Sequence, residues 1–195
     1  MSISRLFVLP LAVLAVSAAA LTPAVAQQQN PAGSQTQRDA MARLAFMDGE
    51  WRGTAVINGP GGRMSLTQTE RVGTHLGGSI RVVEGRGYAA DGTTQFNALA
   101  VIAWDERTQA YTFRAYAQGH QGDYPFEATE DGFRWQTPAG PGATIQYVAT
   151  IKDGRWHEVG HYVREGQTPL PYIEMDLRRV GDSDWPGAGA VAPTE

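Results

Sequence analysis

Apolar and polar residues alternate along most of the chain from Trp51 to Val180, in about ten short segments. Turn dipeptides such as Asp91-Gly92, Asp131-Gly132 and Asp153-Gly154 separate many of them. Short strands with tight turns and no helix between them are typical of an antiparallel barrel. The pattern therefore predicts an all-β, up-and-down barrel whose strands span approximately 51–58, 63–76, 79–89, 95–104, 110–118, 124–129, 132–137, 143–151, 155–164 and 172–180.

A short helix is expected just before the first strand. Ser34 or Thr36 can cap its start, and Met41 and Leu44 lie on one face at helical spacing. A helix this short is marginal without tertiary contacts. We therefore expect it to close one end of the barrel.

The N-terminal residues have the pattern of a secretory signal peptide. Arg5 precedes an apolar run, Leu6 to Leu21, which is followed by the small-x-small site Ala24-Val25-Ala26. Cleavage after Ala26 would leave a periplasmic or secreted protein without a stable membrane anchor. An uncleaved anchor is the alternative, which Pro10 and Pro23 disfavour. The expected organisation is a signal peptide (1–26), a flexible leader (27–37), a barrel domain (38–180) and a disordered tail (181–195).

Composition excludes several classes of function. The formal net charge of −4 gives no electrostatic reason to expect nucleic acid or an anionic membrane as a partner. The chain has no cysteine, so its stability must come from its core. It also lacks a Gly-x-Ser-x-Gly motif and a phosphate-binding loop, which removes the commonest hydrolase and nucleotide-binding classes. The sequence does not indicate the oligomeric state.

Alternation on the clearest strands predicts which side chains face the barrel lumen. Tyr111, Phe113 and Tyr147 point inward on this reading, as does the Ile173-Met175-Leu177 set of the last strand. Aromatic side chains at these positions form either the core or a wall on which a ligand stacks.

On the less regular strands the same rule places polar groups inside. Glu70, Glu84, Arg86, His157 and His161 would all face the lumen. Buried polar groups need partners, so they would form an internal network or a cluster that anchors a ligand. Arg86 would then meet an acidic group of that ligand. A single bulge would reverse the parity and place these side chains in water.

Gly49-Glu50-Trp51 at the entry to the first strand resembles the opening of calycins, the lipocalin, fatty-acid-binding and nitrobindin-like barrels. The resemblance implies a calycin-like barrel in which Arg178 or Arg179, near the end of the last strand, stacks on Trp51.

A second resemblance extends over roughly residues 44–180. It is carried by Phe46-x-x-Gly49-x-Trp51-x-Gly53, by the segment 100–111 with Trp104-Asp105, and by Glu174 to Arg179. These motifs are similar to a bacterial family known as a domain of unknown function, number 1579. The resemblance implies the barrel and an exported protein, and supplies no chemistry.

The sequence thus predicts an exported barrel that holds a small apolar or amphipathic molecule without a cofactor. One alternative is an enzyme with Glu70, Glu84 and His161 as acid–base groups. The nitrobindin-like resemblance implies a haem reading through His161. A third alternative is a filled barrel without a ligand. His157 and His161 lie two pleats apart on a strand, too far for easy chelation of one metal ion, so no metal site is predicted.

Overall fold

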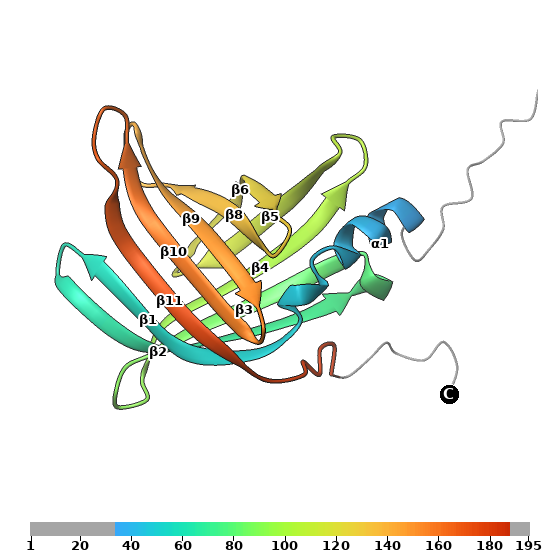
Figure 1. Ribbon diagram of the computed structural model, residues 1–195, viewed down its shortest axis with the longest axis horizontal. Helices are drawn as coiled ribbons and strands as arrows, with labels where there is room; N and C mark the ends of the chain where they lie inside the picture. The colour runs from blue at the N-terminus through green and yellow to red at the C-terminus, as the bar shows by residue number, and fades with distance from the viewer. Residues whose placement is uncertain (1–33, 188–195) are drawn as a thin grey trace, which may run out of the picture.

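Eleven antiparallel strands curl into one barrel-shaped sheet in the computed structural model, which describes residues 34–187 (Figure 1). The N-terminal elements are α1 (Gln35–Ala42) and the short 3₁₀ helix η1 (Ala45–Met47). The first strands are β1 (Gly49–Gly59), β2 (Gly62–His75), β3 (Ile80–Tyr88), β4 (Thr94–Asp105), β5 (Ala110–Ala117) and β6 (His120–Tyr124), with the 3₁₀ turn η2 (Leu76–Gly78) between β2 and β3. The remaining strands are β7 (Phe126–Ala128), β8 (Gly132–Pro138), β9 (Ala143–Lys152), β10 (Arg155–Arg164) and β11 (Leu170–Gly181).

The strands follow one another around the barrel as hairpins. Their order in the sheet is β6-β5-β4-β3-β2-β1-β11-β10-β9-β8-β7, so the first strand pairs with the last. The edge strands β6 and β7 are consecutive in the chain and are joined through Pro125. Proline has no N–H to offer to a strand ladder, which accounts for the break at this point. The predicted all-β up-and-down barrel is confirmed.

Each of the ten predicted strands is present, and β6 is the additional one. Its sequence, His120-Gln121-Gly122-Asp123-Tyr124, is polar and contains no apolar alternation. It is held as a strand by its ladder with β5, in which Arg114 of β5 faces and ion-pairs with Asp123. Tertiary pairing, rather than pattern, defines this element.

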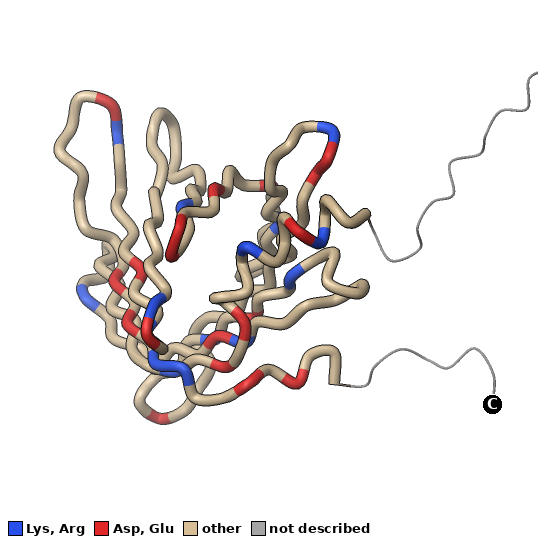
Figure 2. Tube along the Cα trace, turned by 45° about the vertical axis from the view of Figure 1, so that its right-hand side comes forward, with Lys and Arg blue, Asp and Glu red and all other residues tan. Residues whose placement is uncertain are grey.

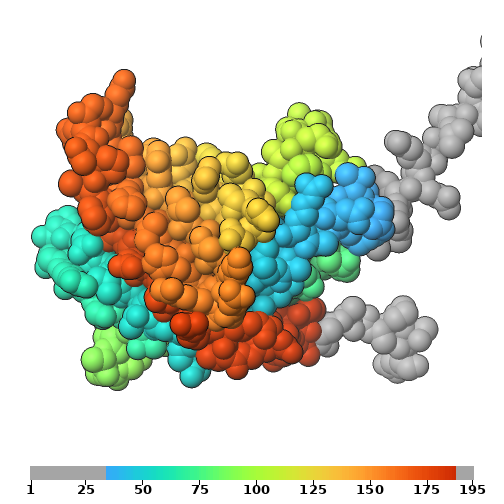
Figure 3. All heavy atoms as spheres, in the orientation of Figure 1, coloured from blue at the N-terminus to red at the C-terminus, as the bar shows by residue number. Residues whose placement is uncertain are grey.

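The N-terminal helix lies against one end of the barrel. Ser34 caps it by accepting a hydrogen bond from the Gln37 backbone N–H at 3.0 Å. Residues 35–37 therefore belong to the helix and not to the expected leader. In Figure 3 this blue segment lies between the orange C-terminal part of the barrel and the yellow-green turn between β4 and β5. Met41, Leu44 and Met47 are fully buried there, as expected for a plug.

A buried arginine ties this plug to β3. Arg81 is 2% exposed and donates to both carboxylate oxygens of Asp48, at 2.6 and 2.8 Å, and to the Met41 carbonyl at 2.6 Å. The planar guanidinium suits this bidentate contact. Nearby, the indole N–H of Trp51 donates to the Met47 carbonyl at 2.9 Å. The entry to the first strand is therefore fixed by hydrogen bonds from two buried side chains.

Neither arginine near the end of β11 stacks on Trp51. Arg178 is exposed, and Arg179 donates to the Asp48 carbonyl at 3.3 Å and ion-pairs with Asp182. Trp51 packs edge-on against Trp156 instead. The cation–π closure implied by the calycin resemblance is therefore wrong for this chain. The Arg179 guanidinium lies beside Gly49, where it binds the backbone instead of the Trp51 ring.

The start of the predicted disordered tail is also placed against the barrel. Gly181 belongs to β11, and Asp184 ion-pairs with Arg71 of β2 at 3.3 Å. Trp185 packs edge-on against His75 with ring centroids 5.9 Å apart. The expected tail is thus wrong at its start, and its last residues, 188–195, lie outside the described part.

The predicted signal peptide (1–26) also lies outside the described residues. Within 34–187, no helix has the length and apolar content needed to cross a membrane. Figure 2 shows acidic and basic residues interspersed over the described chain rather than gathered on faces of one sign.

Candidate functional site

The barrel lumen contains a cavity of about 330 Å³. Its floor is a row of sheet partners that runs from Glu70 on β2 through Gly85, Ala98 and Ala117 to His120 on β6. A second row of partners, Val83, Ala100 and Ala115, lies beside it. Small side chains on β3, β4 and β5 leave space that larger residues would fill, and the cavity follows from them.

The rest of the cavity wall is largely aromatic. Trp135 stacks on Tyr147 with ring centroids 4.0 Å apart and planes 11° apart. The rings then continue through Phe113, Phe126 and Phe133, with successive centroids 5.1 to 5.5 Å apart. Offset and tilted contacts of this kind hold aromatic side chains in fixed orientations. The lumen therefore has a rigid apolar wall that faces a floor of small residues.

Glu158 of β10 is a buried carboxyl in this aromatic wall. The indole N–H of Trp135 donates to one of its oxygens at 2.8 Å, and that of Trp156 donates to the other at 3.1 Å. Burial raises the pKa of Glu158 above its usual range, and the two indole hydrogen bonds partly oppose that rise. Both oxygens already have a protein donor, so this carboxyl positions the two indoles.

Glu70 of β2 is the second carboxyl of the lumen. Its Oε1 accepts a hydrogen bond from the Gln68 amide at 2.7 Å. A Cβ at Gly85 would lie 2.8 Å from Oε1 and 2.9 Å from Oε2, so the carboxyl rests directly over this glycine. Burial raises the pKa of Glu70 to about 8, and the negative charges of Glu158 and Glu84 act in the same direction. Glu70 is therefore largely protonated at neutral pH.

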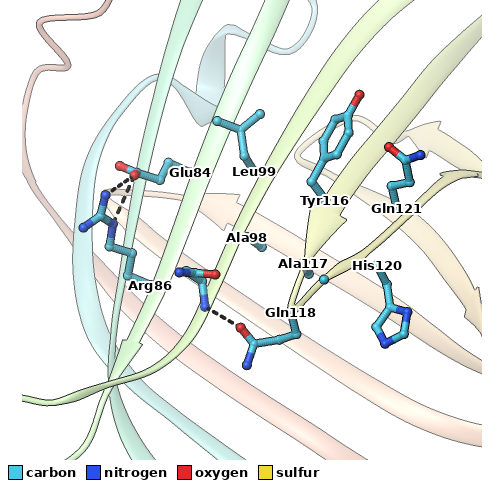
Figure 4. A pocket seen from close by; sticks show the side chains of 11 residues that line it. Glu84, Arg86, Ala98, Leu99, Tyr116, Ala117, Gln118, His120 and Gln121 are labelled. Carbon is cyan, nitrogen blue, oxygen red and sulfur yellow. Dashed lines mark hydrogen bonds and ion pairs between the residues drawn. The ribbon is translucent and has the colours of Figure 1, made fainter.

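Glu84 and Arg86 do not face the lumen, which corrects the sequence prediction. They lie on the outer face of β3 and pair with each other, Arg86 Nε donating to Glu84 Oε1 at 3.0 Å (Figure 4). Together with Leu99 and Tyr116 they line an open groove outside the barrel. The inward positions of this strand belong to Arg81, Val83, Gly85 and Gly87. Apolar residues on both faces of β3 misled the parity argument.

His157 and His161 are also outside the lumen. His157 lies 3.1 Å from a Glu174 carboxylate oxygen on the neighbouring strand, and His161 shares its face of β10. The inward residues of this strand are Trp156, Glu158 and Gly160. The acid–base and haem hypotheses both required His161 in the lumen, so its position outside the barrel removes their basis.

The aromatic predictions are confirmed in orientation. Phe113 and Tyr147 line the lumen. Among the polar residues that were expected inside, Glu70 of β2 also lines it. Tyr111 also points inward, but its hydroxyl donates to the Ala40 carbonyl at 2.7 Å, so it packs against the plug and not around the cavity. Burial raises the pKa values of Tyr111 and Tyr147.

Sequence reasoning missed Glu158, because Val159 between two histidines suggested the opposite parity for β10. The available signal was Trp156-x-Glu158-x-Gly160, a large aromatic residue and a glycine on one face. That face packs against Tyr147, and a Cβ on Gly160 would lie 2.9 Å from its ring. Size complementarity with β9, rather than polarity, sets the face that points inward.

Fold and lumen together define an antiparallel up-and-down β-barrel with an internal cavity. The crystal structure of Rv2717c from M. tuberculosis superposes on it with a TM-score of 0.55 and 12% identity, over 72% of this chain and 97% of that one. At this identity the likeness shows the fold alone. No family model and no curated protein matches the sequence, so the resemblance to family number 1579 stays a prediction.

Proposed function

We propose that this protein is an exported small-molecule-binding barrel that holds one mainly apolar ligand in its lumen. The observation that supports it best is the cavity of about 330 Å³ between an aromatic wall and a floor of glycine and alanine. Binding sites for small molecules are concave and mainly apolar, with a few polar groups that orient the ligand. Gln68 and Glu70 are such groups here.

The size of the cavity limits the ligand. The cavity volume is about 330 Å³. This is the lower end of the usual range of ligand sites. A single or fused ring with a short substituent fits better than a long-chain fatty acid.

Binding is better supported than catalysis. Two carboxyls with raised pKa values in one cavity are a feature of many active sites. Glu158, however, already accepts a hydrogen bond from an indole on each of its oxygens. Among the Glu and His side chains that line the cavity, this leaves Glu70 and the exposed His120, which lie at opposite ends of the floor row. A filled core without a ligand is disfavoured by the cavity itself.

Binding can be tested with N-phenyl-1-naphthylamine, a neutral apolar dye whose fluorescence rises in apolar surroundings. The wild type should bind it with saturation. Ala98→Phe, which fills the floor of the lumen, should weaken binding, whereas Leu99→Phe on the outer face of the same strand should leave it unchanged. Equal effects of the two substitutions, or no saturable binding, would refute the proposal. Native mass spectrometry of the purified protein would reveal a retained ligand directly.

A further inference from the structure

The polar groups of the lumen indicate its ligand class, an inference that rests on the proposed binding function. No lysine or arginine is found among the described residues that line the cavity. The carboxyls of Glu70 and Glu158 lie there without a positive partner. An acidic ligand, which the sequence suggested through Arg86, would therefore meet no lysine or arginine counter-charge, and would be repelled by either carboxyl whenever that carboxyl ionised.

Glu70 is the carboxyl with capacity left for a ligand. Glu158 has an indole donor on each oxygen, whereas the hydrogen bond to Glu70 within the described chain comes from Gln68. A carboxylate offers about four acceptor positions, so several remain free on Glu70. Gln68 also has a carbonyl oxygen, which can accept a second hydrogen bond from the same ligand group.

Space leads to this carboxyl along the floor of the cavity. Glu70 lies over Gly85, and the next partners in the same row are Ala98 and Ala117. None of these three has a side chain that can shield the carboxyl from the cavity. A polar head group can thus reach Glu70 while the rest of the ligand stays in the lumen.

The aromatic wall suits the remainder of such a ligand. A continuous set of ring contacts lines the cavity beside this floor, formed by Tyr147, Trp135, Phe113, Phe126 and Phe133. Aromatic rings stack on a flat apolar body, and their faces attract a cation. The wall and the carboxyl therefore favour the same kind of molecule.

We propose that the lumen binds a small organic cation: an ammonium group at Glu70 and Gln68, attached to a flat apolar body that packs on the aromatic wall. A nearby ammonium favours the carboxylate form of Glu70. Since burial keeps this carboxyl largely protonated in the empty lumen at pH 7, binding transfers its proton to the solvent while the ligand stays charged. Glu158 across the lumen and Glu84 behind β3 oppose the ionisation, and His120 lies at the far end of the row.

Three probes with one indole body test this proposal by titration calorimetry at pH 7. They are tryptamine, which is cationic, tryptophol, which is neutral, and indole-3-acetate, which is anionic. Wild type should bind tryptamine about tenfold or more tighter than tryptophol, with indole-3-acetate the weakest. Repeating the tryptamine titration in buffers of different ionisation enthalpy should reveal the released proton.

Glu70→Gln should reduce tryptamine affinity to the level of tryptophol, leave tryptophol nearly unchanged, and abolish proton release. Glu84→Gln removes the same charge from the outer face of β3 and should preserve all three results. Equal affinity for tryptamine and tryptophol, in a protein that still binds N-phenyl-1-naphthylamine, would overturn the cation proposal and leave the binding function standing. Failure to bind that dye as well would overturn both.

Discussion

Glu70→Gln should stabilise the protein without ligand at neutral pH, even though it alters one of the two proposed ligand anchors. The carboxyl has an ordinary pKa of 4.5 and a pKa of about 8 in the fold. Between these values the folded protein holds a proton that the unfolded chain has lost. Stability therefore falls as pH rises through this window, and the loss is complete above about pH 8. Glutamine keeps the shape and accepts from Gln68, but cannot ionise in the unfolded chain.

The size of the effect follows from the same values. At pH 7 the unfolded carboxyl is 2.5 pH units above its pKa of 4.5, and each unit is worth about 1.36 kcal/mol. The substitution should therefore raise the unfolding free energy by at most about 3.4 kcal/mol at pH 7, and by less than about 1 kcal/mol at pH 5. The lumen reaches this carboxyl, so water there makes these values upper limits. A full effect would raise the melting temperature by roughly 7–14 °C at pH 7.

Urea unfolding of the wild type and Glu70→Gln, at pH 5 and pH 7 without ligand, measures the difference. Glu106→Gln is the matched control, because it removes one acidic charge from an exposed turn. Glu106→Gln should change the unfolding free energy by the same amount at pH 5 and at pH 7. Part of the wild-type pH dependence should survive in Glu70→Gln, since burial also raises the pKa of Glu158. The reasoning fails if Glu70→Gln destabilises the protein at pH 7, or if its gain is the same at both pH values.

Three further predictions concern the plug, the core and the N-terminus. Arg81→Met should lower the unfolding free energy by about 3 kcal/mol, because it leaves the buried Met41 carbonyl without its donor and removes two hydrogen bonds from Asp48. Arg155→Met breaks an equally bidentate pair in which the arginine itself is exposed, and should change stability little; equal losses in urea unfolding would contradict this. Trp51→Ala should cost about 3–5 kcal/mol, and an unchanged melting temperature would remove Trp51 from the core. N-terminal sequencing of exported protein should begin at Gln27, and a mature chain that retains the apolar run would mean an anchored protein.

The architecture was readable from the sequence because several strands alternate cleanly. The predicted inward orientation is correct for Tyr147 on β9 and for Ile173, Met175 and Leu177 on β11. The helix cap at Ser34 was readable for a different reason: it depends on the chemistry of neighbouring residues alone. Strand β6 was not readable, because its strand geometry comes from pairing with β5 and from no pattern of its own.

The candidate site was harder to predict because a cavity removes the signal that reveals a strand's inner face. A filled core demands large apolar side chains inside, and so produces alternation. The floor of this cavity has small ones instead, and β3 turns Gly85 and Gly87 inward while Val82 and the Glu84–Arg86 pair lie outside. On such a strand, hydrophobicity assigns the inner face to the wrong set of alternate residues. Glycine at every second position, facing a carboxyl on the neighbouring strand as Gly85 faces Glu70, is the more reliable mark of the lumen.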